Sequence, residues 1–252
     1  MNLKLDNTYA IVLAAGKGKR MKSPLPKVLH PLAGKLLIDW VLDTVAQLDI
    51  SKTIIVVGHD RKKVIEHIRS RNDSGNFDFA VQEELLGTAD AVKRALPKLP
   101  EDGDVFVLCG DVPLLRAETL RRLLSLHKKT SAAATILTAI LQNPAGYGRI
   151  VRSADDSVEK IVEHRDASDD ELKIREINSG TYIFELAHLR KAIAIVKNDN
   201  AQGEFYLTDV IHILRELFGM RISALSIEDR WEVEGINSKK QLSEMENYFD
   251  ML

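Results

Sequence analysis

A loop rich in glycine and cationic residues directly follows the first apolar run of the chain, and this limits what the fold can be. The run Tyr9–Leu13 has the length and composition of a buried strand. Gly16 and Gly18 then let the backbone turn sharply and approach a ligand closely. Five cations crowd into the loop: Lys17, Lys19, Arg20, Lys22 and Lys27. A solvated basic turn is the general alternative, but a cationic glycine loop at the end of a first strand favours a polyphosphate site.

Two common phosphate-binding motifs are excluded. A P-loop requires Gly-x-x-x-x-Gly-Lys-Ser/Thr, and the position five after Gly16 is Met21. The dinucleotide-binding fingerprint requires a third small residue at that same position. The sequence therefore predicts a different kind of nucleotide-binding loop.

The bulk properties exclude several classes of protein. The 252 residues allow one large α/β domain or two small ones, and the formal net charge is only −2. A nucleic-acid binder would normally be clearly basic, and no apolar run approaches membrane-spanning length. The single cysteine, Cys109, excludes an internal disulfide, and the polar segment 1–8 does not resemble a signal peptide. We therefore expect a cytoplasmic protein with no nucleic-acid or membrane partner.

Strand-like and helical patterns alternate through the first half of the chain. Short apolar runs predict strands at 53–57, 77–81 and 104–108, and helical spacing predicts helices around 37–48, 64–68, 88–96 and 120–127, with Thr88 as a possible cap. This alternation predicts an α/β fold with a Rossmann-like, mostly parallel mixed sheet flanked by helices.

The second half is less regular. Strands are predicted at 132–141, 149–152, 158–164 and 177–184, and helices at 187–196, 208–218 and 238–249. Because few helices separate these strands, we expect an antiparallel region there. The polar stretch 166–173 is predicted to be a surface loop.

Two polar residues follow predicted strands, where α/β folds bind their ligands. Asp111 lies just past the strand at 104–108, where a carboxylate suits Mg²⁺ but also suits a turn or a helix cap. Gln82 follows the strand at 77–81, and its amide suits a pyrimidine edge but is also an ordinary surface group. The residues alone leave both alternatives open.

A set of short motifs in a fixed order resembles the sugar-phosphate nucleotidyltransferases. The resemblance is closest to the uridyltransferase (pyrophosphorylase) domains of bifunctional bacterial N-acetylglucosamine-1-phosphate uridyltransferases. The glycine loop has the pattern Leu-x-x-Gly-x-Gly-x-Arg-Met followed by Pro-Lys. The further blocks, which run through nearly the whole chain, are Gln82 with Leu86–Thr88, Gly110–Leu114, Gly146–Ile150, Val162–His164, Glu176–Asn178, Asn200–Asp209 and Val233–Asn237. Each block alone is weak, whereas the ordered set is specific.

This resemblance implies one nucleotidyltransferase domain over residues 1–252. The nucleotide-binding half would cover about 1–130, and the sugar-binding half with the antiparallel region about 131–252. The implied reaction is the Mg²⁺-dependent condensation of UTP with N-acetylglucosamine 1-phosphate to UDP-N-acetylglucosamine and pyrophosphate. The same reaction with UTP or dTTP and glucose 1-phosphate stays open, as does a nucleotide-sugar-binding protein without turnover.

The resemblance also implies roles for individual residues. Arg20 and the glycine loop would hold the leaving phosphates, and Lys27 would bridge the incoming sugar phosphate and the α-phosphate. Asp111, the third catalytic residue, and Asn237 would bind Mg²⁺. The implied nucleotide-binding residues are Leu13, Ala14, Ala15, Gly16, Gly18, Gln82, Gly87 and Thr88. The implied sugar-binding residues are Gly148, Glu163 and Asn178.

The chain departs from the family's pattern in three ways. Cys109 stands where the family usually has an aromatic residue, and Asp90 stands where it often has histidine. The reaction needs no nucleophilic side chain, so none is expected of Cys109. The hexapeptide repeats that follow this domain in the bifunctional enzymes are not found in the sequence. We therefore expect no acetyltransferase activity, and a monomer or weak dimer.

Overall fold

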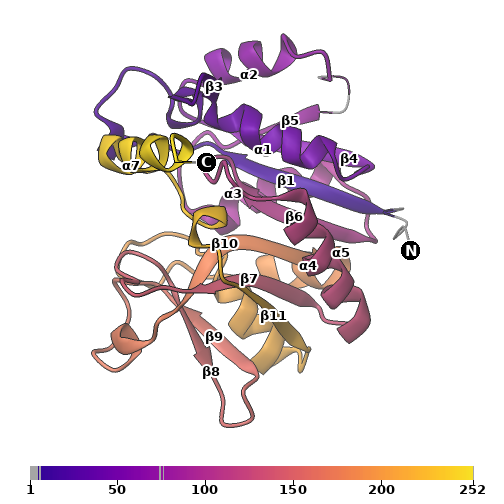
Figure 1. The fold of residues 1–252 in the computed structure, drawn as a ribbon. Helices are drawn as coiled ribbons and strands as arrows, with labels where there is room; N and C mark the ends of the chain where they lie inside the picture. Colours follow the sequence, from indigo (N-terminus) through magenta and orange to yellow (C-terminus); the bar gives the residue numbers. More distant parts are fainter. Residues whose placement is uncertain (1–4, 6, 74, 76, 252) are drawn as a thin grey trace.

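Nine strands form one mixed sheet in the computed structural model, which describes residues 5, 7–73, 75 and 77–251 (Figure 1). Most of the segment 1–8, excluded above as a signal peptide, lies outside the described residues. Four strands of the first half run parallel, in the order β5-β4-β1-β6. Their bounds are β1 Thr8–Ala14, β4 Lys52–Val57, β5 Phe77–Val81 and β6 Asp104–Cys109.

Strands of the second half continue the sheet beyond β6. The order there is β6-β10-β7-β11, in which β10 is antiparallel to both β6 and β7. A hairpin of β8 and β9 joins the start of β10 through the pairing of Ile177 with Arg149. The bounds are β7 Ala134–Ile140, β8 Arg149–Arg152, β9 Val158–Val162, β10 Glu176–Glu185 and β11 Ile222–Ile227. The predicted mostly parallel sheet with an antiparallel region is confirmed.

Helices cover both faces of the sheet, because alternate residues of each central strand are buried on opposite sides. In β1, Ile11 packs into one core with helices α3, α5 and α6, while Ala10 and Val12 pack into a second core with α1, α2 and α4. The helix bounds are α1 Leu37–Ala46, α2 Arg61–Arg69, α3 Thr88–Ala95, α4 Ala117–Thr130, α5 Leu186–Ile193, α6 Asp209–His212 and α7 Lys239–Phe249.

A third, smaller core fastens the C-terminal helix over the N-terminal half. Helix α7 packs through Met245 against Met21 of the glycine loop and Leu32 of the short hairpin β2 Pro31–Leu32 and β3 Lys35–Leu36. In Figure 1 the yellow α7 accordingly lies beside β3 and α1 rather than beside the second-half strands. This packing returns the segment before α7, which contains Asn237, to the N-terminal half of the chain.

Three local expectations differ from the structure. Strand β11 and the short strands β2 and β3 were not predicted. The helix expected at 208–218 is divided into α6 and a π-helical turn, Ile213–Leu217. Thr88 does not cap α3: Gly87 is the residue before the helix, and the Thr88 hydroxyl accepts a hydrogen bond from the Leu207 N–H at 3.0 Å instead. None of the helices in the described part of the chain is long and apolar enough to cross a membrane.

Candidate active site

The carboxyl ends of the parallel strands bring together three residues that are far apart in the sequence. Lys27 Nζ contacts a carboxylate oxygen of Asp111 and lies 3.1 Å from the side-chain oxygen of Asn237. Asp111 follows β6 by two residues, and its carbonyl accepts a hydrogen bond from the Ile236 N–H at 2.9 Å. This backbone bond holds Asn237 beside Asp111. Two oxygens from distant segments therefore converge on one cationic group.

Gly18 makes this arrangement sterically possible. Its backbone has φ +60°, in the left-handed region that side chains rarely adopt. A Cβ at this position would lie 2.7 Å from Lys27 Cβ. Gly18 thus allows the loop to fold back against Lys27 and supports the site from behind, whereas Gly16 faces a cavity.

That cavity, of about 360 Å³, opens between the glycine loop and the segment after β5. Its lining includes Lys27 and Asp111 together with all but one of the predicted nucleotide-binding residues: Leu13, Ala14, Ala15, Gly16, Gln82, Gly87 and Thr88. Gly18, the remaining one, does not line the cavity. Arg20 is exposed in the short turn Lys19–Met21, and within the described residues its side chain makes no hydrogen bond or ion pair. Of the predicted catalytic and nucleotide-binding residues, all except Arg20 and Gly18 therefore line this one cavity.

Gln82 and Gly87 form one wall of the cavity through defined contacts. Gln82 is 4% exposed, so the alternative of an ordinary surface residue is wrong. Its amide nitrogen donates to the Gly87 carbonyl at 2.9 Å and to Asp90 at 3.0 Å. Gly87 has φ +120°, and a Cβ there would lie 2.4 Å from the Phe205 carbonyl oxygen. Only glycine fits at this wall.

The three predicted sugar-binding residues lie close to one another at the second-half strands. The Asn178 N–H donates to the Gly148 carbonyl at 2.9 Å, and the Asn178 amide donates to the Tyr182 hydroxyl at 2.6 Å. Glu163, just past β9, accepts a hydrogen bond from the Thr208 hydroxyl at 3.2 Å. Because the β10 register pairs Tyr182 with Val107, Asn178 lies toward the same edge of the sheet as Asp111.

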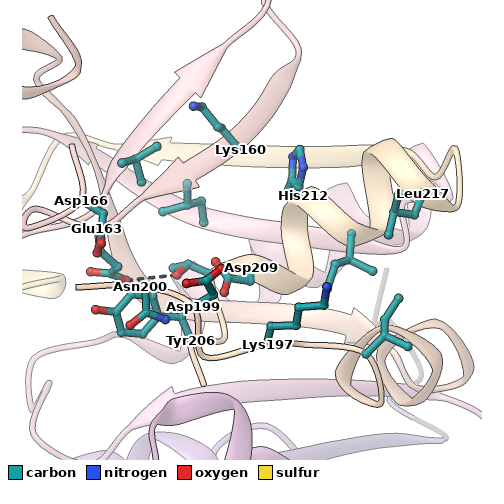
Figure 2. A pocket seen from close by; sticks show the side chains of 15 residues that line it. Lys160, Glu163, Asp166, Lys197, Asp199, Asn200, Tyr206, Asp209, His212 and Leu217 are labelled. Carbon is teal, nitrogen blue, oxygen red and sulfur yellow. Dashed lines mark hydrogen bonds between the residues drawn. The ribbon is translucent and has the colours of Figure 1, made fainter. Parts of the chain in front are cut away.

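Glu163 also lines a second cavity, of about 520 Å³ (Figure 2). Figure 2 shows Glu163 at one end with Asp166 and Tyr206, and Leu217 at the other end. Burial raises the pKa of Glu163, and the negative charges of Asp166, Asp209 and Glu204 raise it further, although the Thr208 hydrogen bond lowers it. A carboxyl group with a raised pKa in a cavity is typical of a functional site.

Cys109 lines the first cavity, where its surroundings disfavour the thiolate that a nucleophile would need. Its sulfur lies 3.6 Å from the Gly180 carbonyl oxygen. Burial and the Asp111 charge raise the pKa of the Cys109 thiol to about 12, so the thiolate is scarce at neutral pH. Sequence reasoning missed Glu204, which lines the first cavity, and Tyr206 and Thr208, which line the second. The signal was available, because all three belong to the motif Asn200–Asp209.

The oxygen atoms of Asp111 and Asn237 suit a hard divalent cation. Mg²⁺ uses few protein oxygens when phosphates supply its other ligands. Here one carboxylate and one amide oxygen already converge on the Lys27 ammonium group. Across the described ranges no group of three histidine, cysteine or acidic side chains forms a self-sufficient metal site. The donor set therefore fits a cation that is shared with phosphate groups.

A family model described as the MobA-like NTP transferase domain matches residues 10–169. The chain belongs to this family. The match covers the glycine loop, Lys27, Gln82 and Asp111, so the prediction of a nucleotidyltransferase is confirmed.

Relatives and solved structures agree with this assignment. The bifunctional protein GlmU of Bacillus cytotoxicus is 50% identical over 244 residues, which are 96% of this chain and 52% of that protein. GlmU of Bacillus cereus strain G9842 is 49% identical over the same shares. The chain thus spans about half the length of the curated relatives it matches. Two structures of UDP-glucose pyrophosphorylase share the fold. The complex with UDP-glucose aligns with this chain at a TM-score of 0.78 and 17% sequence identity, and the apo form aligns at a TM-score of 0.80 and 16% identity. Both alignments cover 97% of this chain and 98% of the other.

Proposed function

We propose that this chain transfers the uridylyl group of UTP to N-acetylglucosamine 1-phosphate, with Mg²⁺ bound, and releases pyrophosphate. The observation that carries the proposal is the contact of Lys27 with both Asp111 and Asn237 beside the cavity that Gln82 and Gly87 line. The named relatives, about half of whose length this chain matches, support a role in nucleotide-sugar synthesis. The division into a nucleotide half and a sugar half stays a prediction, as does a monomer or weak dimer.

The base and the phosphates of UTP would occupy different parts of the first cavity. Gln82 and Gly87 would contact the uracil, because they offer polar atoms at a wall with no room for a side chain at position 87. Gly16 and the backbone from Leu13 to Ala15 would face the nucleotide at the end of β1. Arg20 would turn in from its exposed position to hold the β- and γ-phosphates, because its guanidinium makes no hydrogen bond or ion pair to any residue that the structure describes.

Asp111 and Asn237 would hold the Mg²⁺ ion with their side-chain oxygens. When bound, this ion would neutralise phosphate charge and orient the α-phosphate against the sugar phosphate. Lys27 would then be free to contact the same two phosphates as a positive point charge. The proposed roles use residues that are already within contact distance of each other in the structure.

The reaction needs no general base. The second pKa of a sugar phosphate is about 6, so the attacking phosphate oxygen is largely deprotonated at neutral pH. This oxygen would form a bond to the α-phosphorus while the bond from the α-phosphorus to the bridging oxygen breaks, and pyrophosphate would leave with that electron pair. Lys27 and Arg20 would supply positioning and positive charge, which are the main sources of catalysis in such transfers.

The sugar would bind between the first cavity and the second-half strands. Gly148, Glu163 and Asn178 lie together there, and Glu163 offers an acceptor for sugar hydroxyl groups. The proposed substrates are small anionic metabolites, which fits a cytoplasmic protein with a near-neutral net charge of −2 and no nucleic-acid partner.

The experiment is a pyrophosphate-release assay with a panel of nucleoside triphosphates and sugar 1-phosphates, with and without EDTA. UTP with N-acetylglucosamine 1-phosphate should give the highest kcat/KM. A higher kcat/KM with glucose 1-phosphate, or with dTTP, would favour the alternative transferases. Binding of UTP without pyrophosphate release would favour a non-catalytic nucleotide-sugar-binding protein. Lys27→Ala should lower pyrophosphate release, whereas Lys62→Ala, which changes an exposed lysine of α2 outside the glycine loop, serves as the control and should not.

A further inference from the structure

Asp90 is a buried acidic residue that lies behind the wall of the first cavity and contacts Gln82, which lines that wall. It is 8% exposed and does not line the cavity itself. One of its carboxylate oxygens accepts a hydrogen bond from the Gln82 amide nitrogen at 3.0 Å. The other lies 3.2 Å from Arg94 Nε, one turn later on α3, so the charge of Asp90 is compensated on the side away from Gln82.

These contacts determine which end of the Gln82 amide faces the cavity. The amide nitrogen has two hydrogens, and its two partners, the Gly87 carbonyl and the Asp90 carboxylate, can only accept. Rotating the amide by half a turn would place its oxygen against both acceptors, which is strongly unfavourable at a residue that is 4% exposed. The nitrogen is therefore used internally. Among the described residues no donor contacts the amide oxygen, which stays available to a ligand.

We propose that Asp90 is a positioning residue that fixes the Gln82 amide with its oxygen toward the base, and so selects uracil or thymine over cytosine. Uracil and thymine carry a hydrogen on ring nitrogen N3, which can donate to this oxygen. Cytosine has an unprotonated N3 and would place acceptor against acceptor. This inference rests on the proposed use of UTP at the same cavity and assigns a function to the histidine-to-aspartate departure noted in the sequence.

Discrimination of this kind is strong because it depends on an unpaired acceptor rather than on size. A site built to hydrogen-bond one polar group rejects an analogue that cannot make the bond, since buried polar groups are then left without partners. Gly87 alone holds only one hydrogen of the amide, so the Asp90 contact supplies the second constraint. Without Asp90 the Gln82 amide can rotate and offer either end to a base.

The test compares kcat/KM for UTP and CTP, with one sugar 1-phosphate, in the wild type and in Asp90→Leu and Asp90→Ala. Leucine keeps the number and branching of the side-chain heavy atoms without the carboxylate, and alanine is the best helix former at a position flanked by Ala89 and Ala91. We expect the UTP-to-CTP ratio of kcat/KM to fall at least tenfold in both variants, mainly through a higher KM for UTP. Arg94→Gln removes the ion pair but keeps the Gln82 contact, so its ratio should stay within twofold of the wild type.

A purely structural role for Asp90 would lower UTP and CTP turnover by the same factor. A folded Asp90→Ala or Asp90→Leu protein with an unchanged UTP-to-CTP ratio therefore overturns the proposal. If the wild type releases no pyrophosphate from any triphosphate, the proposed function fails instead. The base preference is then measured from the equilibrium binding of UTP and CTP by calorimetry, where the same loss of preference in the Asp90 variants supports the positioning role and an unchanged preference refutes it.

Discussion

Replacing Lys27 with methionine should tighten the binding of a divalent cation to the free protein while it lowers turnover. Lys27 Nζ contacts Asp111 and lies 3.1 Å from the Asn237 side-chain oxygen, so the ammonium group occupies the point where the two proposed metal ligands converge. A cation that binds these oxygens must displace it. Methionine keeps most of the aliphatic stem and removes the charge.

The size of the effect follows from the exposure of the ion pair. The Lys27 and Asp111 side chains are 16% and 13% exposed. The strength of their ion pair should therefore lie between that of an exposed pair and that of a buried one. Exposed pairs contribute roughly 0.2–1 kcal/mol, and hydrogen bonds to charged groups about 1.5–3 kcal/mol. We take about 1–2 kcal/mol as the cost of displacing Lys27, which corresponds to a 5- to 30-fold gain in cation affinity in Lys27→Met at about 1.4 kcal/mol per factor of ten.

Turnover should change in the opposite direction. Loss of a positive group that faces the transferring phosphates lowers kcat by roughly 10²–10³-fold. The first assay titrates Mn²⁺ into nucleotide-free protein and follows free Mn²⁺ by electron paramagnetic resonance; the second measures pyrophosphate release. Lys62→Met, which changes an exposed lysine of α2 outside the glycine loop, should leave both unchanged. Equal or weaker Mn²⁺ binding by folded Lys27→Met would refute the view that Lys27 and the metal share two ligands.

Three further changes test the same site. Asp111→Ala should leave a folded protein by circular dichroism but lower turnover by roughly 10²-fold or more, and EDTA should abolish wild-type activity; near-normal metal-dependent turnover would disprove the role of Asp111. Gly18→Ala should lower the free energy of unfolding by about 1–2 kcal/mol in urea titration, because Gly18 has φ +60° and a Cβ there meets Lys27. Gly16→Ala is the control: a Cβ at Gly16 meets no atom within 4 Å, so the free energy of unfolding should change by less than about 0.5 kcal/mol. Burial raises the pKa of Glu163, so folding favours its protonated form and stability is lost as pH rises from the ordinary carboxyl pKa through the raised one. Glu163→Gln should therefore raise the Tm by about 2 °C or more at pH 8 and by little at pH 4; equal shifts at both pH values would contradict this.

The sequence was sufficient for the architecture because burial on both faces leaves a clear pattern. Each central parallel strand is a continuous apolar run, and β1 shows why: Ala10 and Val12 enter one core and Ile11 the other. Since parallel strands end at a common edge, the positions of Asp111 and Gln82 just after predicted strands made both residues candidates for that edge, but their assignment to a ligand site needed the resemblance to known transferases.

Strand β11 was missed because its pattern is weak. Ile222–Ile227 has neither strict alternation of apolar and polar residues nor a continuous apolar run, because Ser223 and Ser226 interrupt it, and it lies at the edge of the sheet with only its two end residues buried. A short edge strand has neither the continuous apolar run of a central strand nor a hairpin turn to mark it. Its pairing with β7, about 90 residues earlier in the chain, depends on tertiary packing.

Contacts between distant residues were also beyond sequence reasoning. Asn237 reaches Lys27 only because α7 packs back over the N-terminal half, and the resemblance to known transferases, not the residue pattern, indicated its role. The Gln82 amide, which has both a donor and an acceptor, was predicted to suit a pyrimidine edge. The structure shows its donor committed to Gly87 and Asp90, which no spacing rule reveals.

Isotope tracing tests the proposed reaction most directly. The wild type is incubated with Mg²⁺, UTP and N-acetylglucosamine 1-phosphate whose non-bridging phosphate oxygens are ¹⁸O. The ¹⁸O content of each product is then measured by mass spectrometry. If the sugar phosphate attacks the α-phosphorus beside Lys27, every ¹⁸O atom should appear in UDP-N-acetylglucosamine and none in pyrophosphate. Label in the pyrophosphate, or no nucleotide sugar at all, would contradict the proposed transfer.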